Sequence, residues 1–551
     1  MNIPFRNLPG YNELFLDYID DFDSVRRFYE YDFNLSEDFR KCIELASENY
    51  RNNRPFLRKD LTSILSEQNS AFGSGQKTFD NITALNDSNT FAVVTGQQAG
   101  LLTGPLYTII KALNTIQLSE KLNLDFPEND FVPVFWMDTD DHDFLEINNL
   151  SVISKENELK KFSYFEKGIE EEKYLKPVGN LLYDKGIDEL VSELSVSLGK
   201  TDFSESLFEN ISLAYRAGNS VKQAFGIFIN SVIGNSGIVL VDPSDPKIKN
   251  LIKPVFERAL TSSAQLAEKV IGTTVDLEAS HIAQVKPKPI NLFYIHDGNR
   301  YLIEPRDGGN YALKNSRQKF TKEEMYSMLE TSPERFSWNV ITRPVCQDFL
   351  LPTVAYIGGP SEVSYFAQLR EAYKVFDMTM PVIYPRTSVT LLDGRTNSFM
   401  EKNEVEFREL FDEREVIRTV VKKSTDKNPE DIFSKIKDEI NAVFYTYDKE
   451  LSSIDVNQAS AFAKRCTQFI ESLDVARDKF ISAQERQNEV ITGQLRKVLM
   501  NVNPGSLPQE RLLNISMFIN KYGEALIDTL LTEISIDTFM HQTIDPSPKR
   551  E

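Results

Sequence analysis

The segment Thr95-Gly-Gln-Gln-Ala-Gly-Leu-Leu-Thr-Gly-Pro-Leu-Tyr-Thr108 is the most informative about how this chain folds. It follows the apolar run Phe91-Ala-Val-Val94 and leads into a helical pattern that ends near Leu122. A strand, a glycine-rich turn and a helix in this order present backbone N–H groups and a positive helix dipole to an anion. The spacing matches neither a dinucleotide-binding motif nor a Walker loop. We interpret the segment as a binding loop; the alternative is a glycine-rich connection without a ligand.

Short apolar runs elsewhere in the chain have the composition of buried parallel strands. Together with 91–94 they are residues 131–136, 237–242, 353–357 and 381–384. Helical patterns lie between them, at about 105–122, from about 246 to 271, and up to about 376. Alternation of strands and helices predicts right-handed crossovers and parallel pairing. The sequence therefore predicts an α/β fold with a doubly wound parallel sheet of the Rossmann type.

Two longer segments interrupt this pattern and give the expected domain boundaries. At 551 residues the chain is too long for one core. The second long segment includes a hairpin signal at Asp297-Gly298. We expect N-terminal helices with the first half of the core at 1–150, a first connecting insertion at 151–235, core at 236–279, a second insertion at 280–340, the last core strands at 341–390, and a helical region at 391–551.

The C-terminal region has apolar residues at helical spacing. One stripe consists of Phe462, Cys466, Phe469, Leu473, Ala476, Phe480, Ala483, Gln487 and Val490, and a second of Ile432, Ile436, Ile440, Val443, Tyr447 and Leu451. Steps of three and four residues are typical of a heptad seam. We predict an antiparallel pair of long helices joined near 455–459. Two interpretations stay open: a helical pair that packs on its own core, and a coiled coil that also forms a homodimer.

Composition narrows the class of partner and the compartment. A net charge of −20 argues against general binding to nucleic acid or to anionic membranes, because both require basic surfaces. The three cysteines, Cys42, Cys346 and Cys466, are too few for a disulfide framework or a zinc site. No apolar run has transmembrane length, and the N-terminus lacks a signal-peptide pattern. We expect a cytoplasmic protein with no nucleic-acid and no membrane partner.

An acidic cluster follows the second predicted strand, in Trp136-Met-Asp138-Thr-Asp140-Asp141-His142-Asp143, with Glu146 beyond. Ligands of open parallel sheets bind at the carboxyl ends of the strands. We therefore expect Asp140, His142 and Asp143 to be catalytic, with His142 as a general base or phosphate ligand. Alternatives are a helix-capping role for His142 and a divalent-metal site at Asp138, Asp140 and Asp143.

The other strand ends offer further polar groups. Asp242 could bind a ribose or an amine, and Arg386 an anion. Glu362 and Tyr365 could face a substrate amine, whereas a helix cap alone would explain Ser361. Arg343 and Gln347 lie one helical turn apart, which an ordinary helix start also explains.

These segments together resemble the bacillithiol biosynthesis BshC family of cysteine-adding enzymes. The matching motifs include Thr95-Gly-Gln-Gln-Ala-Gly100, Val241-Asp-Pro-Ser-Asp-Pro246, Leu351-Pro-Thr-Val-Ala-Tyr-Ile-Gly-Gly-Pro360 and Pro381-Val-Ile-Tyr-Pro-Arg386. The resemblance implies a core like that of class I aminoacyl-tRNA synthetases and nucleotidyltransferases, two connecting insertions, and a dimerising C-terminal coiled coil. It implies a ligase that adds L-cysteine to the amine of glucosaminyl-malate in the last step of bacillithiol biosynthesis. The synthetase signatures His-Ile-Gly-His and Lys-Met-Ser-Lys-Ser are absent.

The resemblance and the strand-end positions give one set of expected site residues. An amide requires an activated carboxylate, so ATP, alone or as its magnesium complex, is the expected cosubstrate, with Arg386 and Lys111 neutralising its phosphates; no metal ligands are expected. Expected to bind substrate or nucleotide are Thr95, Gly96, Gln97, Gln98, Gly100, Thr103, Gly104, Tyr107, Lys111, Asp242, Arg343, Gln347, Gly358, Gly359, Ser361, Glu362, Tyr365 and Arg386. The rivals are a metal-dependent phosphohydrolase or transferase that uses the 138–143 cluster, and a non-enzymatic coiled-coil partner protein.

Overall fold

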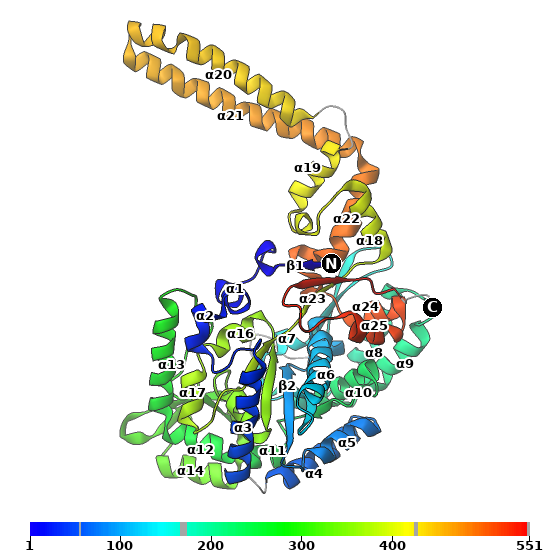
Figure 1. The fold of residues 1–551 in the computed structure, drawn as a ribbon, viewed down its shortest axis with the longest axis vertical. Coiled ribbons are helices and arrows are strands. Elements are labelled where there is room, and N and C mark those ends of the chain that lie inside the picture. Colours follow the sequence, from blue (N-terminus) through cyan, green and yellow to red (C-terminus); the bar gives the residue numbers. More distant parts are fainter. Residues whose placement is uncertain (54–56, 166–173, 424–427, 548–551) are drawn as a thin grey trace. The chain divides into compact units, whose positions relative to one another are not determined.

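The computed structural model describes residues 1–551 except 54–56, 166–173, 424–427 and 548–551 (Figure 1). The chain forms two compact units. The main unit consists of Met1–Leu391 and Leu507–Glu551, and the helical unit of Leu392–Ser506.

A five-stranded parallel sheet forms the centre of the main unit, in the order β13-β12-β2-β3-β6. Its strands are β2 (Thr90–Gln97), β3 (Asp130–Met137), β6 (Val239–Val241), β12 (Thr353–Gly358) and β13 (Val382–Pro385). Nearly every residue in them is buried, because helices cover both faces of the sheet. All five predicted strands and their parallel pairing are confirmed.

Helices connect and cover these strands. Before and beside the first strands lie α1 (Glu13–Asp20), α2 (Phe22–Val25), α3 (Ser36–Asn53), α4 (Leu57–Ala71), α5 (Gln76–Ala84) and α6 (Tyr107–Asp125). The helical stretch predicted after β6 is broken into α11 (Pro246–Leu251), α12 (Lys253–Thr261) and α13 (Ser263–Glu278). Pro254 explains the first break, since proline has no N–H to continue a helix. Before β13 lie α15 (Thr342–Leu350), α16 (Pro360–Phe366) and α17 (Arg370–Val375).

Both segments expected as insertions have their own secondary structure. Helix α7 (Phe144–Ile147) precedes the first, and the hairpin β4 (Asn149–Ile153) and β5 (Leu159–Ser163) begins just before its expected boundary. The rest of the first contains helices α8 (Gly186–Leu198), α9 (Ser204–Ala214) and α10 (Val221–Ile233). The second contains β7 (Leu292–His296), β8 (Asn299–Pro305), β9 (Tyr311–Leu313), β10 (Lys319–Phe320), α14 (Lys322–Thr331) and β11 (Phe336–Trp338). The predicted turn at Asp297-Gly298 joins β7 to β8, and both residues have positive φ.

The helical unit contains the predicted pair of long helices. Its elements are α18 (Gly394–Asn403), α19 (Glu413–Lys423), α20 (Pro429–Ile454), α21 (Val456–Gln487) and α22 (Glu489–Val502). Helices α20 and α21 are antiparallel and joined at Asp455, whose carboxylate caps α21 (Figure 1). The predicted joining point is confirmed. The predicted seam extends past the end of α21, however, since Val490 belongs to α22.

The last segment of the chain belongs to the main unit, so the expected region 391–551 contains parts of both units. It comprises α23 (Gln509–Leu512), α24 (Ile515–Tyr522), α25 (Ala525–Glu533) and β15 (His541–Ile544). Strand β15 pairs with β1 (Asn2–Ile3) and with β14 (Ser388–Leu391). The Gln509 side chain accepts a hydrogen bond from the backbone N–H of Leu391 and donates one to its carbonyl.

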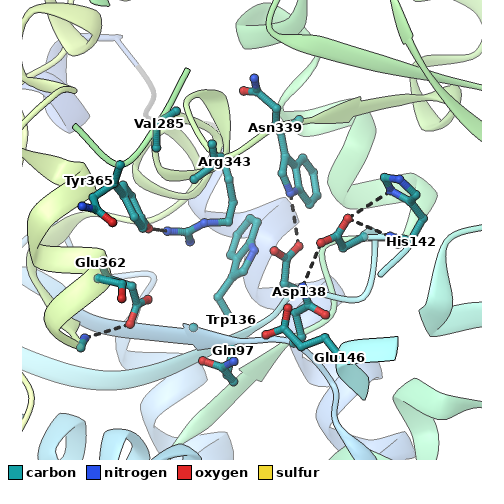
Figure 2. A pocket seen from close by; sticks show the side chains of 18 of the residues that line it. Gln97, Trp136, Asp138, His142, Glu146, Val285, Asn339, Arg343, Glu362 and Tyr365 are labelled. Atoms are coloured by element: carbon teal, nitrogen blue, oxygen red, sulfur yellow. Dashed lines mark hydrogen bonds and ion pairs between the residues drawn. The ribbon is translucent and has the colours of Figure 1, made fainter. Parts of the chain in front are cut away.

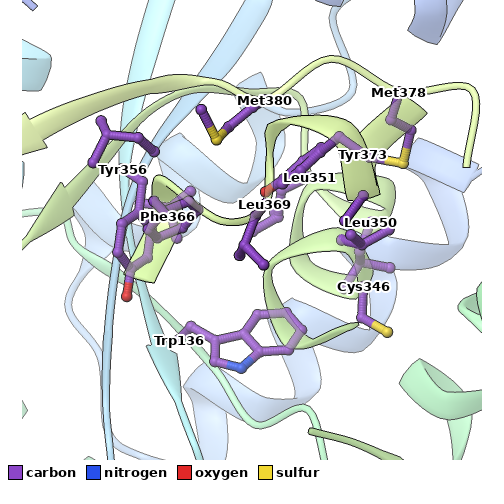
Figure 3. Close-up of a cluster of buried hydrophobic side chains, with 14 of the residues drawn as sticks. Trp136, Cys346, Leu350, Leu351, Tyr356, Phe366, Leu369, Tyr373, Met378 and Met380 are labelled. Carbon is purple, nitrogen blue, oxygen red and sulfur yellow. The ribbon is translucent and has the colours of Figure 1, made fainter. Parts of the chain in front are cut away.

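A cluster of buried apolar side chains packs β3 and β12 against helices α15, α16 and α17, two of which carry site residues. Figure 3 shows Trp136, Tyr356, Phe366 and Leu369 with the Cys346 side of α15. Burial raises the pKa of the Cys346 thiol well above its usual value. The thiol is therefore an inert core group.

Candidate functional site

A cavity of about 1290 Å³ opens at the carboxyl ends of β2, β3 and β12, where the fold predicts a ligand site (Figure 2). The second insertion and the returning C-terminal segment complete its wall. Of the expected residues, those that line it are Gly96, Gln97, Gln98, Tyr107, Lys111, His142, Arg343, Gly359, Ser361, Glu362, Tyr365 and Arg386. Those outside its lining are Thr95, Gly100, Thr103, Gly104, Asp140, Asp143, Asp242, Gln347 and Gly358.

The second half of the glycine-rich loop has a structural role instead of the expected anion-binding one. The N–H of Gly100 donates to the Gln98 carbonyl, and the N–H of Gly104 to the Leu101 carbonyl. Asn514 Nδ2 donates to the Leu102 and Gly104 carbonyls at 2.8 and 2.6 Å. The N–H groups of Gly100 and Gly104 are thus used within the protein, and of residues 95–108 only 96–98 and Tyr107 line the cavity.

Lys111 and Glu362 form a buried ion pair at 2.5 Å on the cavity wall. Lys111 also donates to the Gly96 carbonyl at 2.6 Å. Glu362 accepts from the Tyr356 hydroxyl at 2.6 Å and the Gly359 N–H at 2.8 Å. Burial opposes ionisation of Glu362, but Lys111 and these hydrogen bonds outweigh it and lower the pKa of Glu362. Each charge therefore neutralises the other.

Arg386 is paired in the same way. Its two terminal nitrogens lie 2.9 and 2.8 Å from the carboxylate of Glu510, and both side chains are buried. Glu510 also accepts from the Ser388 hydroxyl and the Val389 N–H. A bidentate pair fixes the guanidinium plane. Arg386 thus shapes the wall, with its charge already compensated.

The structure separates the three residues expected to be catalytic. Asp140 is only 2% exposed and lies 2.5 Å from the Nζ of Lys249, which is 0% exposed. Lys249 also donates to the Phe336 carbonyl at 2.7 Å and lies 4.2 Å from the centre of the Trp338 ring. The Asp143 carboxylate caps α7. The carboxylates of Asp140 and Asp143 thus have partners within the protein, and neither residue lines the cavity.

His142 remains at the cavity, where Asp141 and Arg300 hold its ring. Arg300 Nη1 lies 2.7 Å from both Asp141 Oδ1 and His142 Nδ1, and Gln98 donates to the other Asp141 oxygen. Asp141 Oδ1 lies 3.2 Å from Nδ1. A guanidinium and a carboxylate thus both contact Nδ1, and His142 lines the cavity. Its expected role as a general base or phosphate ligand stays a prediction.

Asp138 and Glu146 are the carboxylates with acid–base character. Burial and the Asp141 charge raise the pKa of Asp138 to about 6. Trp338 Nε1 donates to Asp138 Oδ1 at 3.3 Å. Glu146 reaches the solvent of the cavity, but reduced hydration and the neighbouring aspartates raise its pKa to about 7. Within the described part of the chain neither has an ion-pair partner. Both can exchange protons near neutral pH.

Arg343 supplies a positive charge without a carboxylate partner among the described residues. It is 7% exposed and starts α15. Its terminal nitrogens donate to Gln347 Oε1 at 2.9 Å, Tyr365 Oη at 2.8 Å and Tyr356 Oη at 3.4 Å. The carboxylates of Asp138 and Glu362 act on the guanidinium from beyond ion-pair distance. Its direct partners are neutral, so the guanidinium can still pair with a ligand anion. Gln347 acts as its support.

Other expected binding residues hold the fold together. Thr95 donates to the Ile357 carbonyl and so ties β2 to β12. Asp242 pairs with Lys222 at 2.8 Å and accepts from Thr139. Ser361 lines the cavity but does not cap α16, because Gly359 occupies the capping position.

The metal-site alternative for Asp138, Asp140 and Asp143 lacks the necessary geometry. The three carboxylates have the separate partners given above. In the described ranges, no three or more His, Cys, Asp or Glu side chains are grouped so that they could hold a metal ion.

Among the helices that the structure describes, none combines the length and the apolar composition that a membrane-spanning segment requires.

The fold and the cavity define an α/β protein of the Rossmann type that has a cavity at its strand ends and carries a helical coiled-coil unit. A family model described as the N-terminal Rossmann-like domain of bacillithiol biosynthesis BshC matches residues 1–387, and one for its C-terminal coiled-coil domain matches 389–546. The chain belongs to the BshC family.

Several similar proteins align with this chain over nearly its whole length. Proteins named "Putative cysteine ligase BshC" from Salinibacter ruber and Chloroherpeton thalassium are each 33% identical to it. The alignments cover 98% of this chain and 97% of the first protein, and 99% of this chain and 99% of the second. A Bacillus thuringiensis protein of the same name is 28% identical, over 91% of this chain and 92% of its own length.

Proposed function

We propose that this protein is the ligase that joins the carboxyl group of L-cysteine to the amine of glucosaminyl-malate, the last step of bacillithiol biosynthesis. Membership of the family supports the class of reaction. The observation that carries the finer assignment is the pair Asp138 and Glu146 opposite the uncompensated Arg343 in one cavity. An amino-sugar acid offers the matching groups, namely an ammonium and carboxylates.

The two carboxylates suit the proton transfers that amide formation requires. The amino-sugar ammonium loses one proton to become a nucleophile and a second when its nitrogen bonds the cysteine carbonyl carbon. At pH 7.5 both Asp138 and Glu146 are mostly ionised, with pKa values of about 6 and about 7. A base with a pKa close to the working pH is the most effective proton acceptor. We assign proton acceptance to these two groups.

Activation of the cysteine carboxylate completes the proposal. ATP is the expected source, and the reaction then releases the activating group when the amine attacks. The residues expected to neutralise its phosphates do not fit that role by themselves, since Lys111 is paired with Glu362 and Arg386 with Glu510. We therefore assign no residue to the nucleotide. The assay compares product formation with and without Mg-ATP.

The decisive experiment incubates the purified protein with L-cysteine and glucosaminyl-malate, with and without Mg-ATP, and analyses the thiols by mass spectrometry. We expect bacillithiol only when all three substrates are present. An activity that needs no nucleotide and is abolished by chelators would instead favour the metal-dependent hydrolase or transferase. If the protein forms no product, and if substitutions of cavity residues have no measurable effect on it, the result would favour the non-enzymatic partner protein.

We also propose that the protein is a cytoplasmic homodimer. In the helical unit, Phe462, Phe469 and Phe480 on α21 are 45%, 51% and 59% exposed, although they belong to the predicted apolar seam. A second copy of the α20–α21 hairpin would cover them. The three cysteines are free and buried, which suits a reducing compartment.

A further inference from the structure

Three lysines of the second insertion line the cavity and take no part in the chemistry assigned above. They are Lys286 and Lys288, in the segment between α13 and β7, and Lys314, which follows β9. All three are exposed. In the described part of the chain none of them has an acidic partner within ion-pair distance. Uncompensated positive charge is thus gathered on one wall, in a protein whose net charge is −20.

The backbone that carries these lysines is held rigid. The sequence Lys286-Pro287-Lys288-Pro289 places each lysine before a proline, which fixes φ at the prolines and favours extended backbone at the lysines.

Buried amides anchor both ends of this segment. Gln368 Oε1 accepts from the N–H groups of residues 284 and 285 at 2.9 and 2.8 Å, and its Nε2 donates to the Val285 carbonyl at 2.8 Å. Asn291 accepts from the Lys288 N–H and donates to its carbonyl, both at 3.0 Å. Gln368 and Asn291 are both 0% exposed. Core side chains thus set the position of the lysine segment relative to the cavity.

Lys314 is fixed to the same wall. Its N–H donates to the carbonyl of Leu302 at 2.9 Å, and Leu302 also lines the cavity. Elsewhere in the lining, Lys111, Arg300 and Arg386 are each compensated by a carboxylate, whereas Arg343 has no ion-pair partner among the described residues. The three lysines therefore add to the positive charge that the cavity offers to an anion.

We propose that Lys286, Lys288 and Lys314 form a subsite for the dianionic arm of the acceptor, the two carboxylates of the malate group. This assignment rests on the proposed function. Carboxylates and phosphates share the chemistry that a group of ammonium ions recognises, so the nucleotide is the competing source of the same charge. The malate arm is the better match, because a rigid three-point wall suits a compact dianion. The subsite would then select acidic aglycones over neutral ones.

The test measures binding to the full-length protein by calorimetry, with glucosaminyl-malate, methyl glucosaminide and ATP as separate probes. The variant is Lys286→Gln with Lys288→Gln and Lys314→Gln. The control is Lys319→Gln, an exposed lysine of the same insertion outside the cavity lining. Exposed ion pairs contribute about 1.4-fold to about fivefold each in affinity, so loss of three should lower the affinity for glucosaminyl-malate by a factor between about three and about a hundred. Affinity for methyl glucosaminide and ATP should be unchanged, and the control should behave as the unmodified protein.

Two results would overturn the subsite: unchanged affinity for glucosaminyl-malate in the triple variant, or a loss confined to ATP, which would assign the lysines to phosphates. Added salt should weaken glucosaminyl-malate binding in the unmodified protein more than in the variant, since screening acts on the charges removed. Failure of the proposed function has a different signature. A protein that binds glucosaminyl-malate through these lysines yet forms no amide would retain the subsite and lose the ligase assignment.

Discussion

Replacing Asp140 by Asn tests whether this aspartate is structural or catalytic. The substitution leaves the Lys249 ammonium buried without a counter-charge. Breaking a buried pair on one side typically costs about 3–5 kcal/mol. Lys249 keeps its bond to the Phe336 carbonyl and its contact with Trp338, which offset part of the cost. We therefore expect a destabilisation of roughly 3 kcal/mol at neutral pH.

Deprotonation of Lys249 sets an upper limit to that cost and makes it depend on pH. From the ordinary lysine value of 10.5, neutralising the ammonium at pH 7.5 costs about 4 kcal/mol, at 1.36 kcal/mol per pH unit. In the variant the folded state favours neutral Lys249, whereas the unfolded state keeps the proton. The unfolded state then binds more protons, so stability rises with pH. The deficit should shrink to about 2 kcal/mol at most by pH 9.

Urea denaturation of Asp140→Asn between pH 7 and pH 9, with product formation measured on the same samples, checks this reasoning. Asp140→Asn combined with Lys249→Met should recover most of the stability, because it removes both charges. Asp143→Asn serves as the matched control and should leave the stability nearly unchanged, because the amide oxygen of Asn can still cap α7. A variant of normal stability whose turnover has nevertheless collapsed would refute the structural role and return Asp140 to the chemistry.

Three further outcomes are expected. The value of kcat/KM should fall as the pH decreases through about 7 to about 6, because Asp138 and Glu146 must lose their protons to act. Glu146→Gln should lower the rate roughly tenfold or more. A profile that is flat from pH 5 to 8 would contradict this assignment. Arg343→Gln should raise the KM of a carboxylate substrate at least about tenfold while the melting temperature stays within a few degrees; an unaltered KM would show that the guanidinium only supports the wall. Leu473→Asp with Phe480→Asp should convert a dimer into monomers in light scattering, whereas an unmodified protein that is already monomeric would remove the basis for the dimer.

The fold could be predicted because its signals are local. Each strand of the central sheet is buried on both faces, so it appears in the sequence as an unbroken apolar run. The carboxyl ends of those runs indicated the cavity, and Asp138, His142, Glu362 and Arg386 do lie on its wall. The helix boundaries after β6 were harder to predict, because Pro254 interrupts a stretch of sequence that otherwise has a continuous helical pattern.

The state of each site residue depends on partners that are distant in the sequence. Asp140 meets Lys249 after 109 residues, and Arg386 meets Glu510 after 124. His142 Nδ1 meets an arginine 158 residues away. Nothing in the local pattern marks such pairings, because they arise from tertiary packing. The sequence could therefore place the acidic cluster at a strand end, but it could not show which partner each member has.

The hydrogen bonds between Gln509 and Leu391 have a consequence for how the chain is assembled. They hold Leu391, where the backbone leaves the main unit, next to Gln509, close to where it returns, so the segment Leu392–Ser506 begins and ends at nearly the same place. This segment can therefore become longer or shorter, or be replaced by a brief linker, without displacing β14 or α23. The helical unit can thus change its binding partners during evolution while the cavity stays as it is.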